Sequence, residues 1–151
     1  MRRSDRECPD QEFLQDVLHR AQELQLALHT DDYPYVISLN FALLDGALYM
    51  HCATEGRKLD LIAADPRVAF TACVDVRVDC AHRTTYYKSV CGIGHAVLVT
   101  DTQEKERALQ AISRKYASLC ANPTPEALLQ RTGIIRVDMV RLTGKRHLPK
   151  H

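Results

Sequence analysis

The chain has 151 residues, of which 46% are hydrophobic and 26% charged, and its formal net charge is +1. These values fit a single soluble domain over residues 1–151, and the nearly neutral charge argues against nucleic acid as a partner. The opening segment Met1–Glu7 is charged, and nowhere does an apolar run reach the length of a membrane span. We therefore expect a cytoplasmic protein with no membrane partner.

The cysteines indicate free thiols. An even number is compatible with disulfides, but a chain of this length with an ample core and no secretory signal favours the reduced state. No CxxC pair occurs, and Cys80 with His82 supplies only two ligands, so the sequence predicts no metal site. The six cysteines are Cys8, Cys52, Cys73, Cys80, Cys91 and Cys120.

The first predicted element is an amphipathic helix over Asp10–Glu23, which follows Pro9 and carries apolar residues at helical spacing. Two strands are predicted next: a short apolar run over Leu24–His29, and a run of β-branched and apolar residues over Tyr35–Leu43. The dipeptide Asp45-Gly46 then indicates a tight hairpin turn.

The second arm of this hairpin is predicted over Ala47–Cys52, and a short helix over Arg57–Ala64 ends before Asp65-Pro66. Further strands are predicted over Val68–Val76 and Tyr86–Thr100, the latter long or bent because it contains two glycines.

The last third of the chain is predicted to hold a helix over Thr102–Ala117, a short helix over Thr124–Gln130 and a strand over Gly133–Leu142. Mostly consecutive strands interrupted by a few helices favour a mainly β fold, an antiparallel barrel with flanking helices. No GxGxxG follows a strand, so a Rossmann site is not indicated.

The segment most suggestive of chemistry runs from His51 to Asp60, between a strand and a helix. Thr54, Arg57 and Lys58 stand where the helix begins, and free N–H groups with two cations could hold a phosphate. The alternative is a polar turn whose basic pair is simply solvated.

Five segments in this order and spacing resemble the nitroimidazole-resistance (Nim-type) branch of the pyridoxamine 5'-phosphate oxidase-like superfamily. The resemblance covers nearly the whole chain. The segments are PYVISLNF (34–41), DGALYMHCATEGRKLDLI (45–62), DPRVAF (65–70), TTYYKSVCGIGHAVLV (84–99) and RLTGK (141–145).

This resemblance implies a split β-barrel that binds FMN at the interface of a homodimer. Arg57 and Lys58 match the basic pair that contacts the FMN phosphate in the superfamily, and Thr54 lies beside it. The strand that lines the isoalloxazine is matched by Ser38, Leu39 and Asn40, and a second bordering strand by Ser89 and Val90. The redox chemistry would belong to the flavin, with NAD(P)H as a potential electron donor and a small, for example nitro-aromatic, acceptor.

His51 matches a histidine near the flavin in Nim-type proteins and is the candidate catalytic residue, positioning substrate or donating a proton. The alternative is a strand-end histidine that only packs and hydrogen-bonds. Cys52 is expected to be a small buried residue, and one of Tyr86 and Tyr87 could face the cofactor. His147 and His151 are expected in a mobile basic tail.

Two functions compete with an FMN-dependent oxidoreductase: a haem-binding split barrel, with His51 or His95 as iron ligand, and a non-catalytic flavin binder. The true oxidases carry a longer C-terminal segment that grips the substrate phosphate. This chain ends soon after RLTGK, which argues against vitamin B6 oxidation.

Overall fold

The computed structural model describes residues 3–117 and 131–149. Its strands are β1 (Leu24–Leu28), β2 (Tyr35–Leu39), β3 (Ala42–Leu44), β4 (Ala47–Cys52), β5 (Arg67–Asp79), β6 (Thr84–Leu98) and β7 (Gly133–His147). The helices are α1 (Gln11–Arg20), α2 (Arg57–Ala64) and α3 (Thr102–Tyr116), preceded by the 3-10 turn η1 (Ser4–Arg6).

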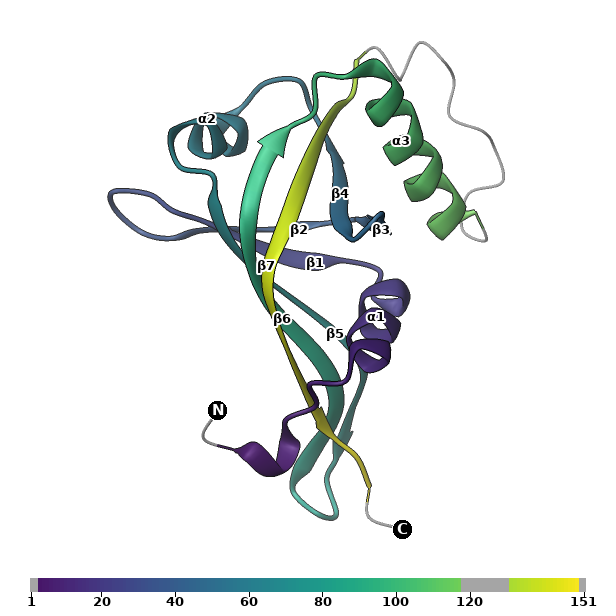
Figure 1. Cartoon of the computed structure of the whole chain (residues 1–151). Helices are drawn as coiled ribbons and strands as arrows, with labels where there is room; N and C mark the ends of the chain where they lie inside the picture. Colours follow the sequence, from purple (N-terminus) through teal and green to yellow (C-terminus); the bar gives the residue numbers. More distant parts are fainter. Residues whose placement is uncertain (1–2, 118–130, 150–151) are drawn as a thin grey trace.

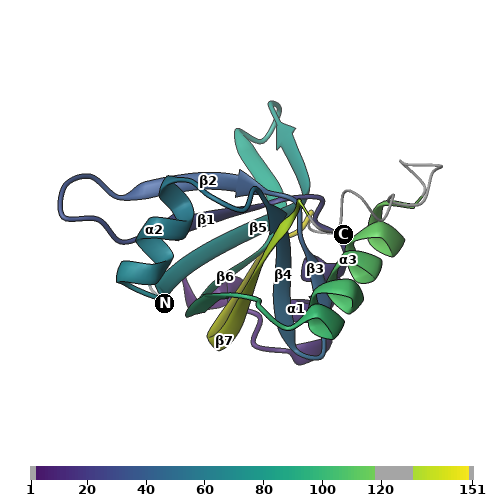
Figure 2. The same ribbon diagram turned by 90° about the horizontal axis from the view of Figure 1, so that it is seen from above.

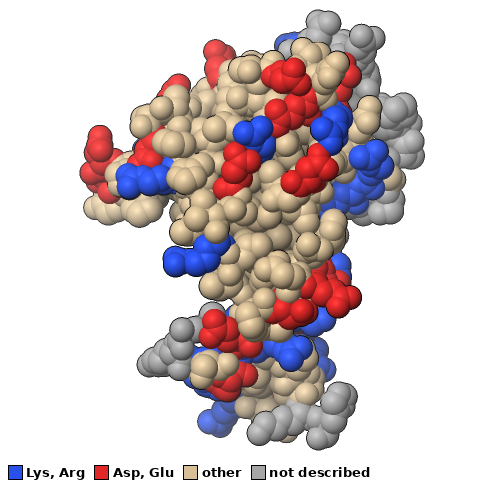
Figure 3. All heavy atoms as spheres, viewed as in Figure 1, with Lys and Arg blue, Asp and Glu red and all other residues tan. Residues whose placement is uncertain are grey.

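All seven strands form one antiparallel sheet in the order β2-β1-β5-β6-β7-β4-β3, curled into an open barrel (Figure 1). The predicted mainly β split barrel with flanking helices is therefore confirmed. No helix in the described ranges is long and apolar enough to cross a membrane. On the face drawn in Figure 3, acidic and basic side chains are interspersed rather than gathered by sign.

Both longer helices begin at an aspartate. The Asp10 carboxylate accepts a 2.9 Å hydrogen bond from Phe13 N at the start of α1, and Asp101 accepts one of 2.7 Å from Glu104 N at the start of α3. These caps bond N–H groups that have no partner within the helix. The predicted first helix was too long, because Ala21 already has an extended backbone.

The apolar interior has two parts that share β4. Leu48 and Met50 point into the barrel core beneath α1 and α2, whereas Ala47 and Tyr49 point into a smaller core beneath α3. Successive side chains of a strand face opposite sides, so β4 is buried on both. Its His51 end, where the burial stops, is exposed.

Strand β5 is longer than predicted, whereas β6 has the predicted length but begins and ends two residues earlier; the two extend as a hairpin away from the barrel (Figures 1 and 2). A register shift between Val74 and Arg77, with Asp75 at φ 55°, bends this arm. In this arm Val76 and Val78 alternate with charged residues, as is typical of a strand, but both valines are exposed.

Two other predictions were wrong. The single strand over Tyr35–Leu43 is divided, because Asn40 and Phe41 form a corner between β2 and β3. His147 is not in a mobile tail: it ends β7, and its Nδ1 lies 2.9 Å from the carbonyl oxygen of Thr85. The predicted helix over Thr124–Gln130 lies outside the described residues, and so does His151.

Candidate functional site

The start of α2 follows directly from the exposed end of β4. Cys52 ends the strand, and Gly56 occupies the N-cap position, where it supplies no side chain to bond the first N–H groups of the helix. Arg57 and Lys58 are the first two residues of α2, and Thr54 is exposed in the turn before them. The turn therefore combines unpaired donors with positive charge, although Asp60 in the same first turn offsets part of it.

The two cations of α2 point toward different neighbours. The guanidinium of Arg57 lies 5.2 Å from the ring centroid of Tyr35, at the start of β2. Lys58 is half-buried near Cys52. Burial raises the pKa of the Cys52 thiol, whereas the positive charges of Lys58 and Lys105 act to lower it. Among residues 3–117 and 131–149, neither Arg57 nor Lys58 forms an ion pair. Both charges are thus available to an anionic ligand.

Strand β2 is an edge of the sheet, because it pairs only with β1. Half of the main-chain N–H and C=O groups on an edge strand point away from its neighbour. Ser38 is exposed, Leu39 packs against the barrel core, and the Asn40 amide donates to Gln22 O at 2.9 Å. Contacts from Leu39 to a ligand would therefore come from its main chain.

Ser89 and Val90 lie on β6, across the sheet from β2. The Ser89 hydroxyl is buried and donates to Lys145 O at 3.4 Å, while the Val90 side chain is fully buried in the core. The register aligns Leu39 with Leu24 and Val90 with Ala72, on strands β1 and β5 that lie between. Ser38–Asn40 and Ser89–Val90 thus lie at one level of the sheet, about 14 Å apart across three strand spacings.

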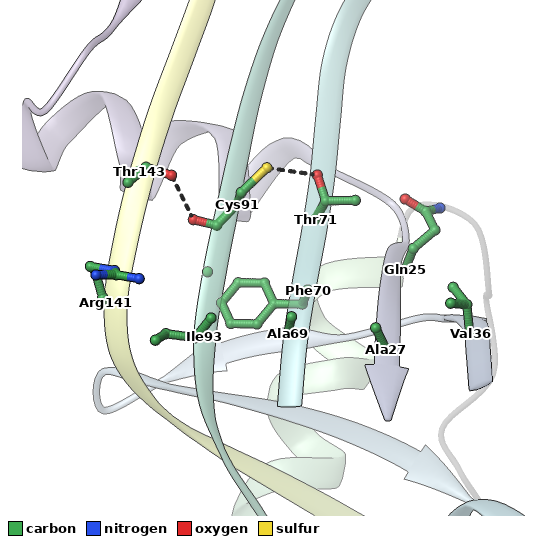
Figure 4. Close-up of a pocket in the computed structure, with 11 residues that line it drawn as sticks. Gln25, Ala27, Val36, Ala69, Phe70, Thr71, Cys91, Ile93, Arg141 and Thr143 are labelled. Carbon is green, nitrogen blue, oxygen red and sulfur yellow. Dashed lines mark hydrogen bonds between the residues drawn. The ribbon is translucent and has the colours of Figure 1, made fainter. Parts of the chain in front are cut away.

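A hollow of about 640 Å³ lies on the outer face of the sheet and extends from Val36 of β2 to Arg141 and Thr143 of β7. Strands β2, β1, β5, β6 and β7 contribute mostly small or apolar side chains to it, and Figure 4 shows Arg141 at one margin. Polar groups line only part of the hollow. One of them is the Thr143 hydroxyl, which donates to Cys91 O at 3.3 Å. The lining residues are Gln25, Ala27, Val36, Ala69, Phe70, Thr71, Cys91, Gly92, Ile93, Arg141 and Thr143.

Sequence reasoning missed this hollow, because each strand contributes only one to three residues to it. Arg141 and Thr143 belong to the RLTGK segment, which was the one available signal. A second hollow of about 790 Å³ adjoins the first and shares Ala27, Ala69 and Ile93 with it. Together they form a largely apolar outer face, hereafter the outer sheet face.

His51 is exposed at the end of β4, opposite Ile134 of β7. It shares a face of β4 with Tyr49, which is covered by α3, but lies beyond that cover. Its imidazole forms no hydrogen bond with another described residue. The chain thus brings His51, Thr54, Arg57 and Lys58 to one end of the barrel, while Ser89 and Val90 lie elsewhere on the sheet.

The curled antiparallel sheet, with a basic helix start at one end and an edge strand beside it, defines a split-barrel protein. The model of the family named pyridoxamine 5'-phosphate oxidase matches residues 10–146, and the chain belongs to this family. The suspected superfamily is thereby confirmed. A comparison with curated proteins finds no match.

Solved structures with the same fold include a candidate 5-nitroimidazole antibiotic resistance protein from Bacteroides thetaiotaomicron. It is 21% identical, with a TM-score of 0.81, over 93% of this chain and 86% of that one. A flavocytochrome from Azotobacter vinelandii is 15% identical, with a TM-score of 0.81, over 99% and 72% of the two chains. A FAD and heme binding protein from Mycobacterium smegmatis is 16% identical, with a TM-score of 0.78, over 97% and 76%. At these identities the likeness is one of fold.

Proposed function

We propose that this chain is an FMN-dependent oxidoreductase that reduces a small acceptor, such as a nitro-aromatic compound, with electrons from NAD(P)H. The observation that carries the proposal is the start of α2, where Arg57 and Lys58 stand unpaired beside free N–H groups. A phosphate with nearly two negative charges suits such a site. The family match and the flavin-binding relatives of the same fold support the assignment.

The outer sheet face offers the kind of surface that a flavin ring needs. Its first hollow is mostly apolar, and Arg141 and Gln25 add a few polar groups that could orient a heterocycle. The flavin would supply the redox chemistry when bound. The protein would bind the phosphate, orient the ring and, at His51, supply a proton to the reduced acceptor.

A homodimer is part of the proposal. The outer sheet face exposes Val36 by 56%, Val140 by 61% and Ile93 by 39%, and apolar faces of this kind mark contact surfaces. A partner subunit there would enclose the two hollows. If so, Val140→Lys should convert dimers to monomers in sedimentation equilibrium, whereas Leu148→Lys, at a residue 43% exposed near the C-terminus, should not. A monomeric wild-type protein would contradict the dimer.

Absorbance spectra of the purified protein test the cofactor, before and after FMN is added and the excess removed. Flavin bands that survive removal support FMN binding. A Soret band would instead favour a haem protein with His51 as a ligand, and a featureless spectrum under both conditions refutes both cofactors. A protein that binds flavin but shows no turnover with any electron donor and acceptor would be a flavin carrier rather than an enzyme.

The phosphate assignment is tested by comparing the affinities for FMN and riboflavin. Two charge-assisted contacts are worth about 3 kcal/mol together, so Arg57→Ala with Lys58→Ala should weaken FMN binding about 100-fold. Riboflavin, which lacks the phosphate, should bind both proteins alike. The control is Arg83→Ala with Arg146→Ala, which removes the same charge on exposed residues of the far hairpin and of β7.

His51→Asn tests the proposed proton donor. FMN binding should persist while turnover falls at least about 100-fold, the lower range for a lost general acid. The fall should be smaller at low pH, where solvent protons substitute. Unchanged turnover would leave His51 as a surface residue of the strand end.

A further inference from the structure

Lys115, in the last turn of α3, lies in an unusual setting for a lysine. Its Nζ donates a 3.0 Å hydrogen bond to the carbonyl of Leu18 near the end of α1. The same atom lies 3.5 Å from the ring centroid of Phe41 and 5.8 Å from that of Tyr116. The amine is therefore held between α1, α3 and the β2–β3 corner.

No described carboxylate forms an ion pair with Lys115. The side chain lines a hollow of about 390 Å³, whose other titratable groups are His19 of α1 and Arg114 of α3. Strand β3 adds only Ala42, Leu43 and Leu44 to this hollow. Lys88, in contrast, pairs with Asp75 at 3.2 Å.

Burial lowers the pKa of Lys115 to about 8. The Phe41 ring and the Leu18 carbonyl favour the ammonium, but they do not replace a counter-charge. At pH 7.5 such a side chain therefore holds far more free amine than an ordinary lysine, which holds about 0.1%. Nucleophilicity falls with basicity, so the net gain in reactivity is about tenfold.

We propose that Lys115 is an acyl-modification site, which small acyl phosphates and thioesters acylate ahead of the other lysines among residues 3–117 and 131–149. The free amine attacks the acyl carbonyl, a C–N bond forms, and the bond from carbon to the phosphate or thiolate leaving group breaks. The leaving group takes the electron pair, and the surplus amine proton passes to solvent. The hollow lined by Ala42, Leu43 and Ala111 gives an acetyl group room.

Acetyl phosphate and the wild-type protein provide the test. Brief exposure between pH 6.5 and 9, followed by peptide mass spectrometry, gives a rate for each lysine. At pH 7.5 Lys115 should be acetylated about tenfold faster than Lys88 and Lys145, with a rate that levels off above pH 8. In guanidinium chloride the preference should vanish. Equal rates in the folded protein, or a preference that survives unfolding, would overturn the proposal.

Ala111→Leu adds a second check, because Ala111 lines the same hollow one helical turn before Lys115 and the larger side chain takes up that space. Lys115 acetylation should then fall severalfold while the other lysines keep their rates. Ala63→Leu, the same change on the exposed surface of α2, is the matched control and should leave every rate unaltered. Circular dichroism establishes that each variant is folded, and a folded Ala111→Leu protein with an unchanged Lys115 rate counts against the proposal.

Discussion

The Tyr116 hydroxyl connects α3 to the β2–β3 corner and to Gln22, between α1 and β1, and its removal should destabilise the protein measurably. Its oxygen accepts a 3.1 Å hydrogen bond from Phe41 N. It also lies 2.5 Å from Gln22 O and 3.1 Å from Phe41 O, so one proton serves two carbonyls. Tyr116→Phe removes this oxygen and preserves the ring.

The expected loss of stability follows from the Phe41 N–H group, which loses its hydrogen-bond acceptor. The side chain of Phe41 is fully buried, and its N–H would be left unsatisfied near an apolar core. An unsatisfied buried donor costs about 1–3 kcal/mol, so we expect a loss of about 2 kcal/mol in the free energy of unfolding. For a domain of this size that corresponds to a fall of roughly 4–8 °C in Tm.

Urea denaturation and calorimetry measure both quantities. Tyr33→Phe is the control, because Tyr33 is 80% exposed and its hydroxyl forms no hydrogen bond with the described residues. Hydrogen exchange should quicken at Phe41 before it does so in β5 or β6. A loss below about 0.5 kcal/mol, comparable to a surface substitution, would refute the hydroxyl's role in holding the corner.

Two further predictions concern stability. Hydrogen bonds from Arg136 and, to a smaller extent, Tyr49 lower the pKa of Glu104. The ionised carboxylate therefore stabilises the fold fully at pH values above its pKa in the unfolded chain, about 4.5. This stabilisation is lost as the pH falls through the lower pKa of the folded protein. Glu104→Gln should cost about 1 kcal/mol at pH 7 and progressively less as the pH falls below 4.5, as chemical denaturation at a series of pH values can show. At Gly92 an added Cβ would lie 2.2 Å from Phe70 Cζ, so Gly92→Ala should cost about 1–3 kcal/mol in the same assay; no loss would mean that the ring moves freely.

Local signals predicted the elements nearest the site most accurately. Strand β4 and helix α2 have the predicted boundaries, because Asp45-Gly46 and Asp65-Pro66 set their ends within a few residues. At the turn, Asp45 and Gly46 both have positive φ values, as that dipeptide indicates. Such turn and helix-end signals depend only on neighbouring residues in the sequence, so they can be recognised without knowledge of the tertiary fold.

Long-range contacts explain what the sequence could not reveal. The break between β2 and β3 is fixed by Tyr116, some 75 residues away. Strand β7 continues past Leu142 to His147 because residues 87–91 of β6 pair with that stretch. The outer sheet face assembles a few residues from each of five strands, and no spacing in one segment can indicate such a surface.

The β2–β3 corner links the stability of the fold to its proposed function. Asn40 and Phe41 form the corner, and their polar groups are bonded to Gln22 and Tyr116. Because β2 is an edge strand, it lacks the second neighbour that holds an inner strand in place. The end of α3 therefore takes over that role, and Lys115 packs on the same Phe41 ring. A ligand bound along β2 would meet a main chain held by side chains of α3, so a change at the end of that helix should reach the edge strand before the rest of the barrel.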